Sequence, residues 1–230
     1  MPRRPQPVGD LKVVALRLVG GAVVLWAVLC LIGVLVTSAL ASGRGQSWDL
    51  GAVVWMAARR TGFWNTITMV GSGLANTSMA VAVTVVVVLF LRWRLGRWYE
   101  SWIVVAAIAG ELLVFLVVTA TVHRPRPSAR ELDAAPPTSS FPSGHTAAAM
   151  ALYGCIAVLL MWTYGRRRAT RVAAVVLYCI PVVVGLSRLY RGMHYPSDVL
   201  VGALGGGLWL LLVITTLLPR RGGADPAPAH

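Results

Sequence analysis

The sequence predicts an all-α protein that crosses a membrane with six helices packed into one bundle. Three observations lead to this prediction. The 230-residue chain is 57% hydrophobic and only 13% charged, which is too apolar for an ordinary soluble domain. The apolar residues are gathered into runs of about 18 or more, long enough to cross the hydrocarbon core of a bilayer. The arginines fall mainly at the ends of these runs, where membrane proteins place them.

Six segments have the length and composition of spanning helices. In chain order they cover residues 13–39, 63–91, 101–121, 144–163, 171–187 and 197–218. Each is near the ~20 residues that a crossing requires, and the second is long enough to tilt or protrude. We therefore expect one membrane domain over residues 13–218, with tails at 1–12 and 219–230.

The first apolar run has some features of a cleavable secretory signal. It follows Arg3 and Arg4, and it ends near Ala39-Leu40-Ala41, which resembles a cleavage site. However, the apolar core of a signal peptide is roughly 7–15 residues long. The run from Val13 to Val36 exceeds that length, so we expect an uncleaved first span.

Residues 47–62 follow the first span and combine aromatic and basic side chains with apolar ones. They include Trp48, Trp55, Arg59 and Arg60. Two structures fit this composition: a short helix lying in the membrane interface, or an irregular loop anchored by its aromatic side chains. The sequence leaves both open.

Individual residues distinguish three of the later spans. In the third span, Glu111 places a costly carboxyl group at membrane depth. It is either a functional group or a protonated acid hydrogen-bonded within the bundle. Pro181 is expected to kink the fifth span. Gly202 and Gly206 give the sixth span a small-residue face that favours close helix packing.

Basic residues are shared unequally between the two sides of the predicted bundle. The larger group lies near the chain ends and in the connections that follow the second and fourth spans. By the positive-inside rule, both termini are expected in the cytoplasm. The clusters described below would then face outward from the cell membrane.

The formal net charge of +13 could suggest nucleic-acid binding. No RNA- or DNA-binding motif accompanies the charge, and membrane topology explains arginines at helix ends. We therefore expect no nucleic-acid partner. Cys30, Cys155 and Cys179 all lie inside apolar runs, which favours small core residues over a disulfide framework or a metal site.

Residues suited to chemistry gather in three clusters just outside the apolar runs, and the third cluster contains a histidine and a carboxylate. His194 and Asp198 are four residues apart at the start of the sixth span, so they share a face within hydrogen-bond reach. A carboxylate held against one imidazole nitrogen fixes the tautomer and raises the basicity of the other nitrogen. Such a histidine can act as a nucleophile or base. The alternative is a carboxylate that stabilises the helix start beside an interfacial histidine.

The second cluster is Pro142-Ser143-Gly144-His145, at the start of the fourth span. Ser143 is a plausible N-cap, and the free N–H groups of a helix start can bind an anion. Gly144 lets an anion approach the backbone closely. His145 could donate a proton to a leaving group. The alternative is an ordinary helix cap followed by a chance histidine.

The first cluster, residues 123–127, supplies Arg124 and Arg126, each followed by a proline that holds the chain extended. Arg188, at the end of the fifth span, adds another guanidinium group. Arginine holds phosphate oxygens in a fixed fork. The alternative is nonspecific binding of lipid head groups.

Together the three clusters contain cationic side chains, which can bind an anion, and imidazole side chains, which can act in catalysis. They include no acidic cluster suited to Mg²⁺ or Ca²⁺ and no zinc-ligand spacing. The set fits phosphoryl transfer without a metal or other cofactor, in which positioning and charge stabilisation provide the catalysis.

The order and spacing of the clusters resemble the signature of the type 2 phosphatidic acid phosphatase superfamily, also called lipid phosphate phosphatases. Residues 187–198 match its third motif in full: Ser-Arg, five residues, His, three residues, Asp. Residues 142–145 match its second motif, Pro-Ser-Gly-His. Arg126-Pro127 match the end of its first motif, in which Thr119 stands at the family's lysine position.

The resemblance implies roles for these residues. His194 would attack phosphorus and form a phosphohistidine, Asp198 would orient it, and His145 would protonate the departing group. Water would then release phosphate. The phosphoryl oxygens would be held by Arg126, Arg188, Ser143 and the amide of Gly144.

Because the family's lysine is absent, the sequence does not show which residue supplies its positive charge. Thr119 can donate one hydrogen bond but carries no charge. His123 or Arg124, both close by in the sequence, could supply the lost positive charge. The departure could lower activity or shift the substrate preference.

The expected function is hydrolysis of a lipid phosphate or pyrophosphate at the outer leaflet. The substrate would be a polyprenyl (pyro)phosphate or a phosphatidate-type lipid whose tail enters between helices. Two alternatives remain: a phosphotransferase that uses the same site, or a non-catalytic lipid-binding membrane protein. Membrane lipids are the other expected partners, and the oligomeric state does not follow from the sequence.

Overall fold

The computed structural model describes residues 10–41, 46–134 and 137–219, and the regular structure within these residues is entirely helical. The all-α prediction is therefore confirmed. Six helices are long and apolar enough to cross a membrane, as predicted. They are α1 (Leu11–Ala41), α4 (Thr77–Leu95), α5 (Tyr99–Thr121), α6 (Gly144–Tyr164), α7 (Arg168–Tyr190) and α8 (Pro196–Leu217). The predicted tails fall largely on residues 1–9 and 220–230, outside the described part of the chain.

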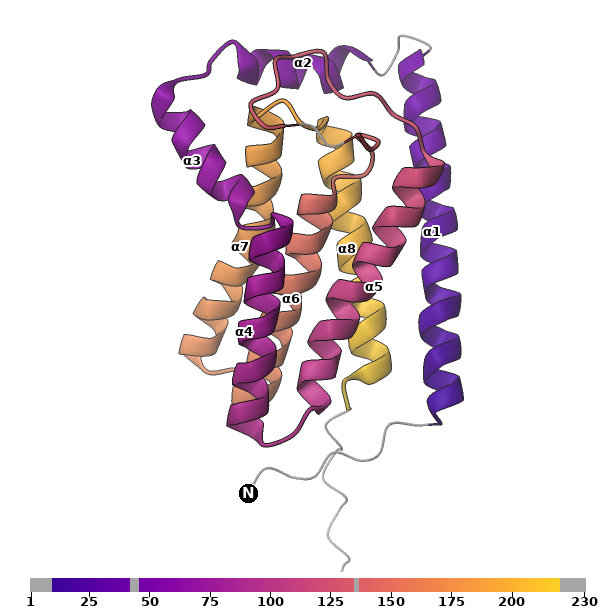
Figure 1. The fold of residues 1–230 in the computed structure, drawn as a ribbon, viewed down its shortest axis with the longest axis vertical. Helices are drawn as coiled ribbons and strands as arrows, with labels where there is room; N and C mark the ends of the chain where they lie inside the picture. The colour runs from indigo at the N-terminus through magenta and orange to yellow at the C-terminus, as the bar shows by residue number, and fades with distance from the viewer. Residues whose placement is uncertain (1–9, 42–45, 135–136, 220–230) are drawn as a thin grey trace, which may run out of the picture.

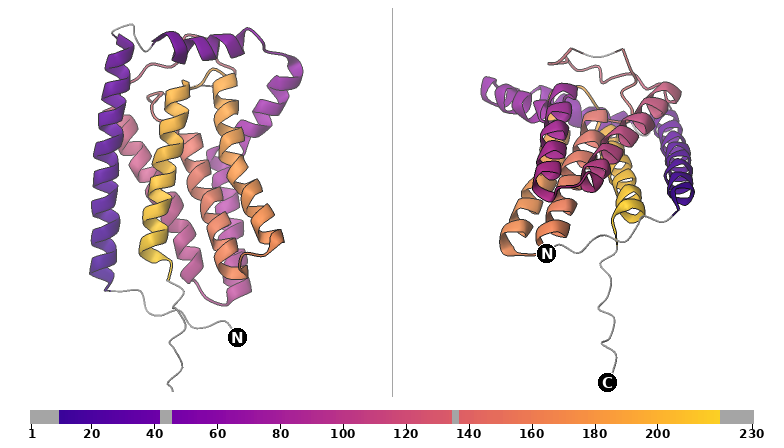
Figure 2. Two further views of the ribbon diagram at one scale, coloured as in Figure 1. Left: turned by 180° about the vertical axis from the view of Figure 1, so that it is seen from behind. Right: turned by 60° about the horizontal axis from the view of Figure 1, so that its bottom comes forward.

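Helix α6 forms the centre of the bundle and packs against α5, α7 and α8 (Figure 1). Small side chains make this possible, because Ala149 and Ala151 are fully buried and Gly154 lies against Leu210 of α8. Helix α1 lies at the edge of the bundle beside α8 (Figure 2). Helix α7 continues through Pro181.

The second predicted span, residues 63–91, is two helices rather than one. Helix α3 (Gly62–Gly73) ends before Leu74, and α4 begins at Thr77. Asn76 caps α4, because its side-chain oxygen accepts a hydrogen bond from Met79 N at 2.8 Å. Across the break, the carbonyl of Leu74 accepts a hydrogen bond from Tyr153 Oη at 2.6 Å. The crossing is therefore made by α4, while α3 descends from the end of the bundle to the break (Figure 1).

Residues 46–57 form helix α2 (Gln46–Ala57), which lies across one end of the bundle (Figure 1). This resolves the choice between an interfacial helix and a loop in favour of the helix. Trp48 and Trp55 are exposed on it. The guanidinium of Arg59 lies 4.2 Å from the centre of the Trp55 ring. Arg60, just beyond the helix, donates hydrogen bonds to the carbonyl of Tyr190 at the end of α7.

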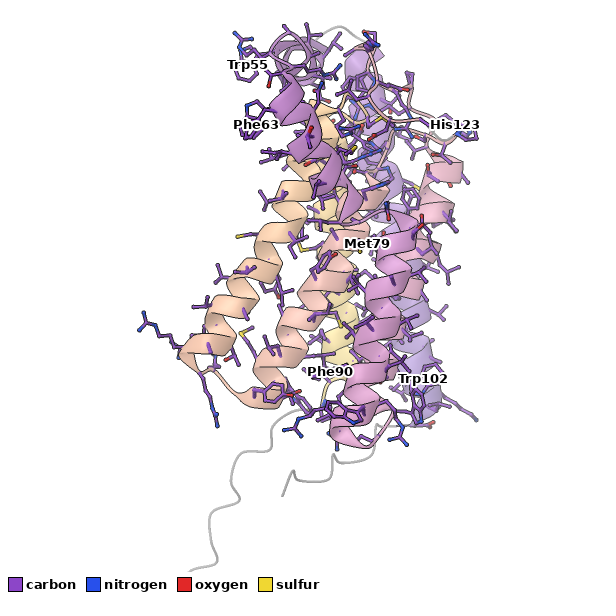
Figure 3. The ribbon with its side chains drawn as sticks, turned by 60° about the vertical axis from the view of Figure 1, so that its left-hand side comes forward. Trp55, Phe63, Met79, Phe90, Trp102 and His123 are labelled. Carbon is purple, nitrogen blue, oxygen red and sulfur yellow. The ribbon has the colours of Figure 1, made fainter. Side chains whose placement is uncertain are left out.

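Different helix ends and connections lie at the two ends of the bundle. The start of α1, the end of α8 and the turn between α6 and α7 lie at one end, and α2 lies at the other (Figures 1 and 2). Exposed aromatic side chains mark both ends: Trp55 and Phe63 near one, Phe90 and Trp102 near the other (Figure 3). Such aromatic belts are typical of the two membrane–water interfaces.

Candidate active site

The three clusters predicted from the sequence meet at one cavity of about 280 Å³. At its polar end the wall includes Arg126, Gly144, His145, Arg188 and His194. The remaining wall is largely apolar and comes from α4, α5 and α6. The cavity therefore joins a cationic, imidazole-rich end to a hydrocarbon-like side.

His194 lies in the short connection between α7 and α8 and is 3% exposed. Its Nδ1 lies 2.7 Å from the carbonyl oxygen of Ser140. A carbonyl oxygen can only accept a hydrogen bond, so Nδ1 carries the proton. The lone pair is then left on Nε2, the nitrogen that a nucleophilic imidazole uses.

Asp198 does not form the direct hydrogen bond to His194 that its spacing predicts. Its Oδ2 is 3.8 Å from His194 Nδ1, which is too long for a hydrogen bond. Instead, Oδ2 accepts from Ser140 Oγ at 2.6 Å and from Tyr195 N at 2.9 Å, and Oδ1 accepts from Arg124. Asp198 thus fixes Ser140, whose carbonyl orients His194.

The environment of His194 favours its neutral form. Burial lowers the pKa of His194 below its ordinary value, Asp198 opposes this effect, and the charges of Arg188 and Arg126 lower the pKa further. The imidazole is therefore unprotonated at neutral pH, as a nucleophile requires.

The start of α6 is open to an anion. Ser143 occupies the N-cap position but forms no side-chain cap, contrary to expectation. Its Oγ lies 2.9 Å from Thr146 Oγ1, and Ser143 is fully buried behind the cavity wall. Gly144 and His145 line the cavity itself. The uncapped amides at this helix start are available to phosphate oxygens.

Gly144 is also required for packing. A Cβ atom added there would lie 2.7 Å from the Phe115 ring. The glycine therefore lets the start of α6 approach α5 closely.

Two arginines are held at the polar end of the cavity by fixed partners. Arg126 Nη1 donates to the carbonyl of Met193 at 2.7 Å. Arg188 Nη1 donates to Ser72 Oγ and to Asp133 Oδ2, both at 2.9 Å. Arg188 Nε is buried and has no partner among the described residues. These contacts orient the guanidinium groups toward one place without using all their donors.

Asp133 is a carboxylate that sequence reasoning missed. It accepts hydrogen bonds from Arg191 as well as from Arg188. Burial raises the pKa of Asp133, but the hydrogen bond and charge of Arg191 and the charge of Arg188 outweigh burial and hold the pKa below its usual range. Asp133 comes from an irregular loop with no periodic pattern, so nothing in its spacing indicates this pairing.

Asp49 is a second residue that the sequence did not identify. It lies on α2, is 1% exposed, and accepts from Arg124 Nη2 at 2.7 Å and from Ser197 N at 3.0 Å. Arg124 bridges Asp49 to Asp198. In the sequence, Asp49 is a single acidic residue within a segment of apolar and aromatic residues. That position indicates that Asp49 has a buried cationic or hydrogen-bonding partner, but it does not identify the partner.

None of the residues considered as replacements for the missing lysine lines the cavity. Thr119 is buried in α5, and its Oγ1 has no partner among the described residues. His123 is exposed and lies at the outer edge of the bundle (Figure 3). Arg124 is committed to Asp49 and Asp198. The geometry therefore leaves the phosphate-binding role to Arg126, Arg188 and the start of α6.

No group of three or more His, Cys, Asp or Glu side chains is placed to share a metal ion within the described ranges. Metal-independent chemistry remains a prediction.

Comparison with known proteins identifies the family. The family model described as the PAP2 superfamily matches residues 100–221, just over half of the chain. The chain belongs to the PAP2 superfamily. All three clusters of this PAP2 chain lie inside the matched region.

Among curated proteins, the PAP2 chain is 42% identical over 82 residues to phosphatidylglycerophosphatase B of Escherichia coli strain K12. It is 34% identical over 83 residues to lipid A 1-phosphatase of Rhizobium etli. The matched segments are 36% of this chain and 30% and 31% of these relatives. The chain therefore matches less than a third of the length of either.

Two solved structures share the fold. The transmembrane PAP2-type phosphatidylglycerolphosphate phosphatase of Bacillus subtilis has a TM-score of 0.74 at 23% identity, over 86% of this chain and 98% of that one. LpxE of Aquifex aeolicus has a TM-score of 0.57 at 22% identity, over 73% of this chain and 94% of that one. The fold of this chain is thus shared with proteins of low sequence identity.

Proposed function

We propose that this protein is an integral membrane lipid phosphate phosphatase that works without a metal ion, through a phosphohistidine on His194. The observation that carries the proposal is the composition of the cavity. One end holds an oriented imidazole, a second histidine and two arginines, and the rest is walled largely by apolar side chains. A substrate with a phosphate head and a hydrocarbon tail fits both parts.

In the first step, His194 Nε2 attacks phosphorus. The N–P bond forms as the bond from phosphorus to the lipid oxygen breaks, and His145 donates a proton to that oxygen. In the second step, His145 accepts a proton from water, which attacks phosphorus and breaks the N–P bond. Inorganic phosphate leaves, and both histidines return to their initial states.

The surrounding groups stabilise the charge that develops. Arg126, Arg188 and the uncapped amides of α6 would hold the three phosphoryl oxygens in the transition state. Asp198, with its Oδ2 3.8 Å from Nδ1, would stabilise the positive imidazole that forms when Nε2 bonds to phosphorus.

The lipid tail is expected to lie between α4 and α5. Val81 and Leu112 line the cavity and are also 57% and 49% exposed on the outside of the bundle. The cavity wall is thus continuous with the surface that faces lipid.

Relatives named as phosphatases of phosphatidylglycerophosphate and lipid A support a lipid substrate, and polyprenyl (pyro)phosphates and phosphatidate-type lipids both remain candidates. The distribution of basic residues supports a site that faces outward from the cell membrane.

The test is phosphate release by purified protein from a panel of lipid phosphates, with His194→Ala as the control. We expect release that EDTA does not diminish and that His194→Ala abolishes without changing thermal unfolding. Full activity of His194→Ala, or strict dependence on Mg²⁺, would contradict the proposed chemistry. Transfer of phosphate to a second lipid with little free phosphate would indicate a phosphotransferase.

A further inference from the structure

Glu111 is a buried carboxyl group in the wall of the proposed substrate cavity. It lies on α5, is 5% exposed, and faces the same space as His145 and Ala148. Within the described part of the chain, its carboxyl group has no hydrogen-bond or ion-pair partner. The bundle therefore does not provide the internal hydrogen bond that would make Glu111 a purely structural acid.

An unpartnered carboxyl group in an apolar wall requires an explanation, because burial without a hydrogen bond costs free energy. An unpaired negative charge costs most at membrane depth, so such a site favours the neutral acid. A neutral carboxylic acid has one O–H to donate. The missing acceptor must then come from something that enters the cavity.

The depth of Glu111 indicates which part of a lipid it would meet. The Phe115 ring of α5 lies against Gly144 at the start of α6, because a Cβ atom added to Gly144 would lie 2.7 Å from that ring. Glu111 precedes Phe115 by four residues on α5, which is about one turn, or ~5.4 Å, along the helix axis, and α5 runs toward the end of the bundle where α6 starts (Figure 1). Glu111 is thus roughly one turn below the start of α6, where phosphate is expected to bind. It also borders a second, smaller cavity beside Pro142 and Ala147.

The chemistry of the two candidate lipid classes differs at this depth. In a glycerol-based lipid phosphate, the ester carbonyl oxygens lie a few bonds from phosphorus, a distance comparable to one helical turn. In a polyprenyl phosphate, the same stretch is hydrocarbon and offers no acceptor. A single donor at this position can therefore distinguish the two classes.

Building on the phosphatase function proposed above, we propose that Glu111 is a substrate-binding residue that donates a hydrogen bond to an ester carbonyl of a glycerol-based lipid phosphate. It thereby favours such lipids over polyprenyl phosphates. Binding of a polyprenyl phosphate leaves the Glu111 carboxyl without a partner, which penalises that substrate.

The test compares two substrates in the same mixed micelles: a diacyl phosphatidate and a long-chain polyprenyl phosphate. Glu111→Leu should lower kcat/KM for the phosphatidate about tenfold, which corresponds to one lost hydrogen bond. It should leave kcat/KM for the polyprenyl phosphate unchanged or raise it. Glu111→Gln retains an N–H donor and should lose less than Glu111→Leu on the phosphatidate.

Ile108→Ala is the matched control, because Ile108 lines the same cavity from one turn away on α5. It removes only apolar contact and should lower turnover of both lipids by the same factor. Thermal unfolding should show that all variants are folded, with Glu111→Leu at least as stable as the parent protein because it removes an unpartnered buried carboxyl group.

Three outcomes would overturn the inference. Equal losses on both lipids in Glu111→Leu would indicate a structural group. No loss on either lipid would indicate that water, for example in the small adjoining cavity, already satisfies the carboxyl group. Failure of the parent protein to hydrolyse any lipid phosphate would instead contradict the proposed function, together with the inference that rests on it.

Discussion

At the residue scale, the state of His194 is set by a backbone atom. The carbonyl of Ser140 receives the Nδ1 proton at 2.7 Å, and Asp198 holds Ser140 through its hydroxyl. This arrangement fixes the tautomer while the carboxylate charge stays near the ring. It differs from a direct histidine–carboxylate pair, because Asp198 holds Ser140 and the Ser140 carbonyl in turn orients the imidazole.

The lowered pKa of His194 predicts the pH dependence of hydrolysis. The nucleophile must be unprotonated, and a lower pKa keeps it unprotonated to lower pH. The acidic limb of the kcat/KM profile should therefore lie below about pH 6.5, the ordinary value for histidine. On the acidic side, activity should be lost as the pH falls through the lowered pKa of His194.

The measurement is a pH–rate profile on two lipid phosphates with different leaving groups. The position of the acidic limb should be the same for both, because it belongs to the enzyme. A limb at or above pH 6.5 on both substrates would show that His194 is not the group described here.

Much of this site follows from sequence spacing, and part of it does not. The ordered motifs predict that His145, His194 and Arg126 meet, and they line one cavity. The partner of His194 could not be predicted, because any residue offers a carbonyl. Asp49 and Asp133 were missed because each reaches its arginine from a distant segment without a repeating pattern.

At the element scale, α2 is joined to the active site by a buried chain of charges. Asp49 on α2 pairs with Arg124, and Arg124 pairs with Asp198 at the start of α8. All three residues are at most 3% exposed. The helix that lies across one end of the bundle is thus connected to the carboxylate that positions His194 through Ser140.

Asp49→Asn should reduce both stability and turnover. The amide loses the charge-assisted hydrogen bond from Arg124 and weakens the one from Ser197 N, which costs roughly 1.5–3 kcal/mol. Arg124 would keep Asp198 and Ser197 but lose its second carboxylate partner, and its shift would displace Asp198 and Ser140. Unfolding in mild detergent and phosphate release measure the two effects, and wild-type values for both would contradict this role of α2.

The glycines of α8 offer a matched pair of substitutions. A Cβ atom added at Gly202 would lie 2.5 Å from the backbone oxygen of Ser143, whereas one added at Gly207 meets Met150 Cγ at an ordinary 3.7 Å. Gly202→Ala should therefore displace the start of α6, cost roughly 1–3 kcal/mol, and lower kcat. Gly207→Ala should be neutral or slightly stabilising.

Thermal unfolding and phosphate release, measured on both glycine variants, check this packing. Equal behaviour of Gly202→Ala and Gly207→Ala would show that α8 does not position the start of α6.

The sequence predicts the number of crossings better than the continuity of each helix. Apolar composition runs through residues 63–91 without a break, so hydropathy alone indicates one long span. The break appears instead in local chemistry: Asn76, followed by Thr77 and Ser78, is an N-cap signal. The structure uses it to start α4 and to place Ala75 and Thr77 in the cavity wall.

At the scale of the whole molecule, the connection between α7 and α8 that carries His194 lies at the opposite end of the bundle from the α6–α7 turn (Figure 1). The basic residues Arg167 and Arg168 mark the turn, and α2 marks the other end. The positive-inside rule predicts that the turn is cytoplasmic and that α2 faces outward. The rule gives a direction because Arg60, Arg126 and Arg191, at the end marked by α2, donate to carbonyl or carboxylate oxygens within the fold.

Single cysteines test this orientation in a background with Cys30, Cys155 and Cys179 replaced. A membrane-impermeant maleimide added to intact cells should label Arg59→Cys but not Arg167→Cys, since both positions are exposed but on opposite sides. Both variants should be labelled after permeabilisation. Labelling of Arg167→Cys alone in intact cells would invert the orientation.

The proposed chemistry requires that His194 become covalently bonded to phosphorus. The most direct measurement incubates purified protein with a lipid carrying a ³²P-labelled phosphate, stops the reaction at alkaline pH, and locates the label by peptide mapping. We predict label on the peptide that contains His194, sensitivity of the label to acid, and no label in His194→Ala. Turnover of the lipid with no label on His194 at any time after rapid quenching would rule out the phosphohistidine.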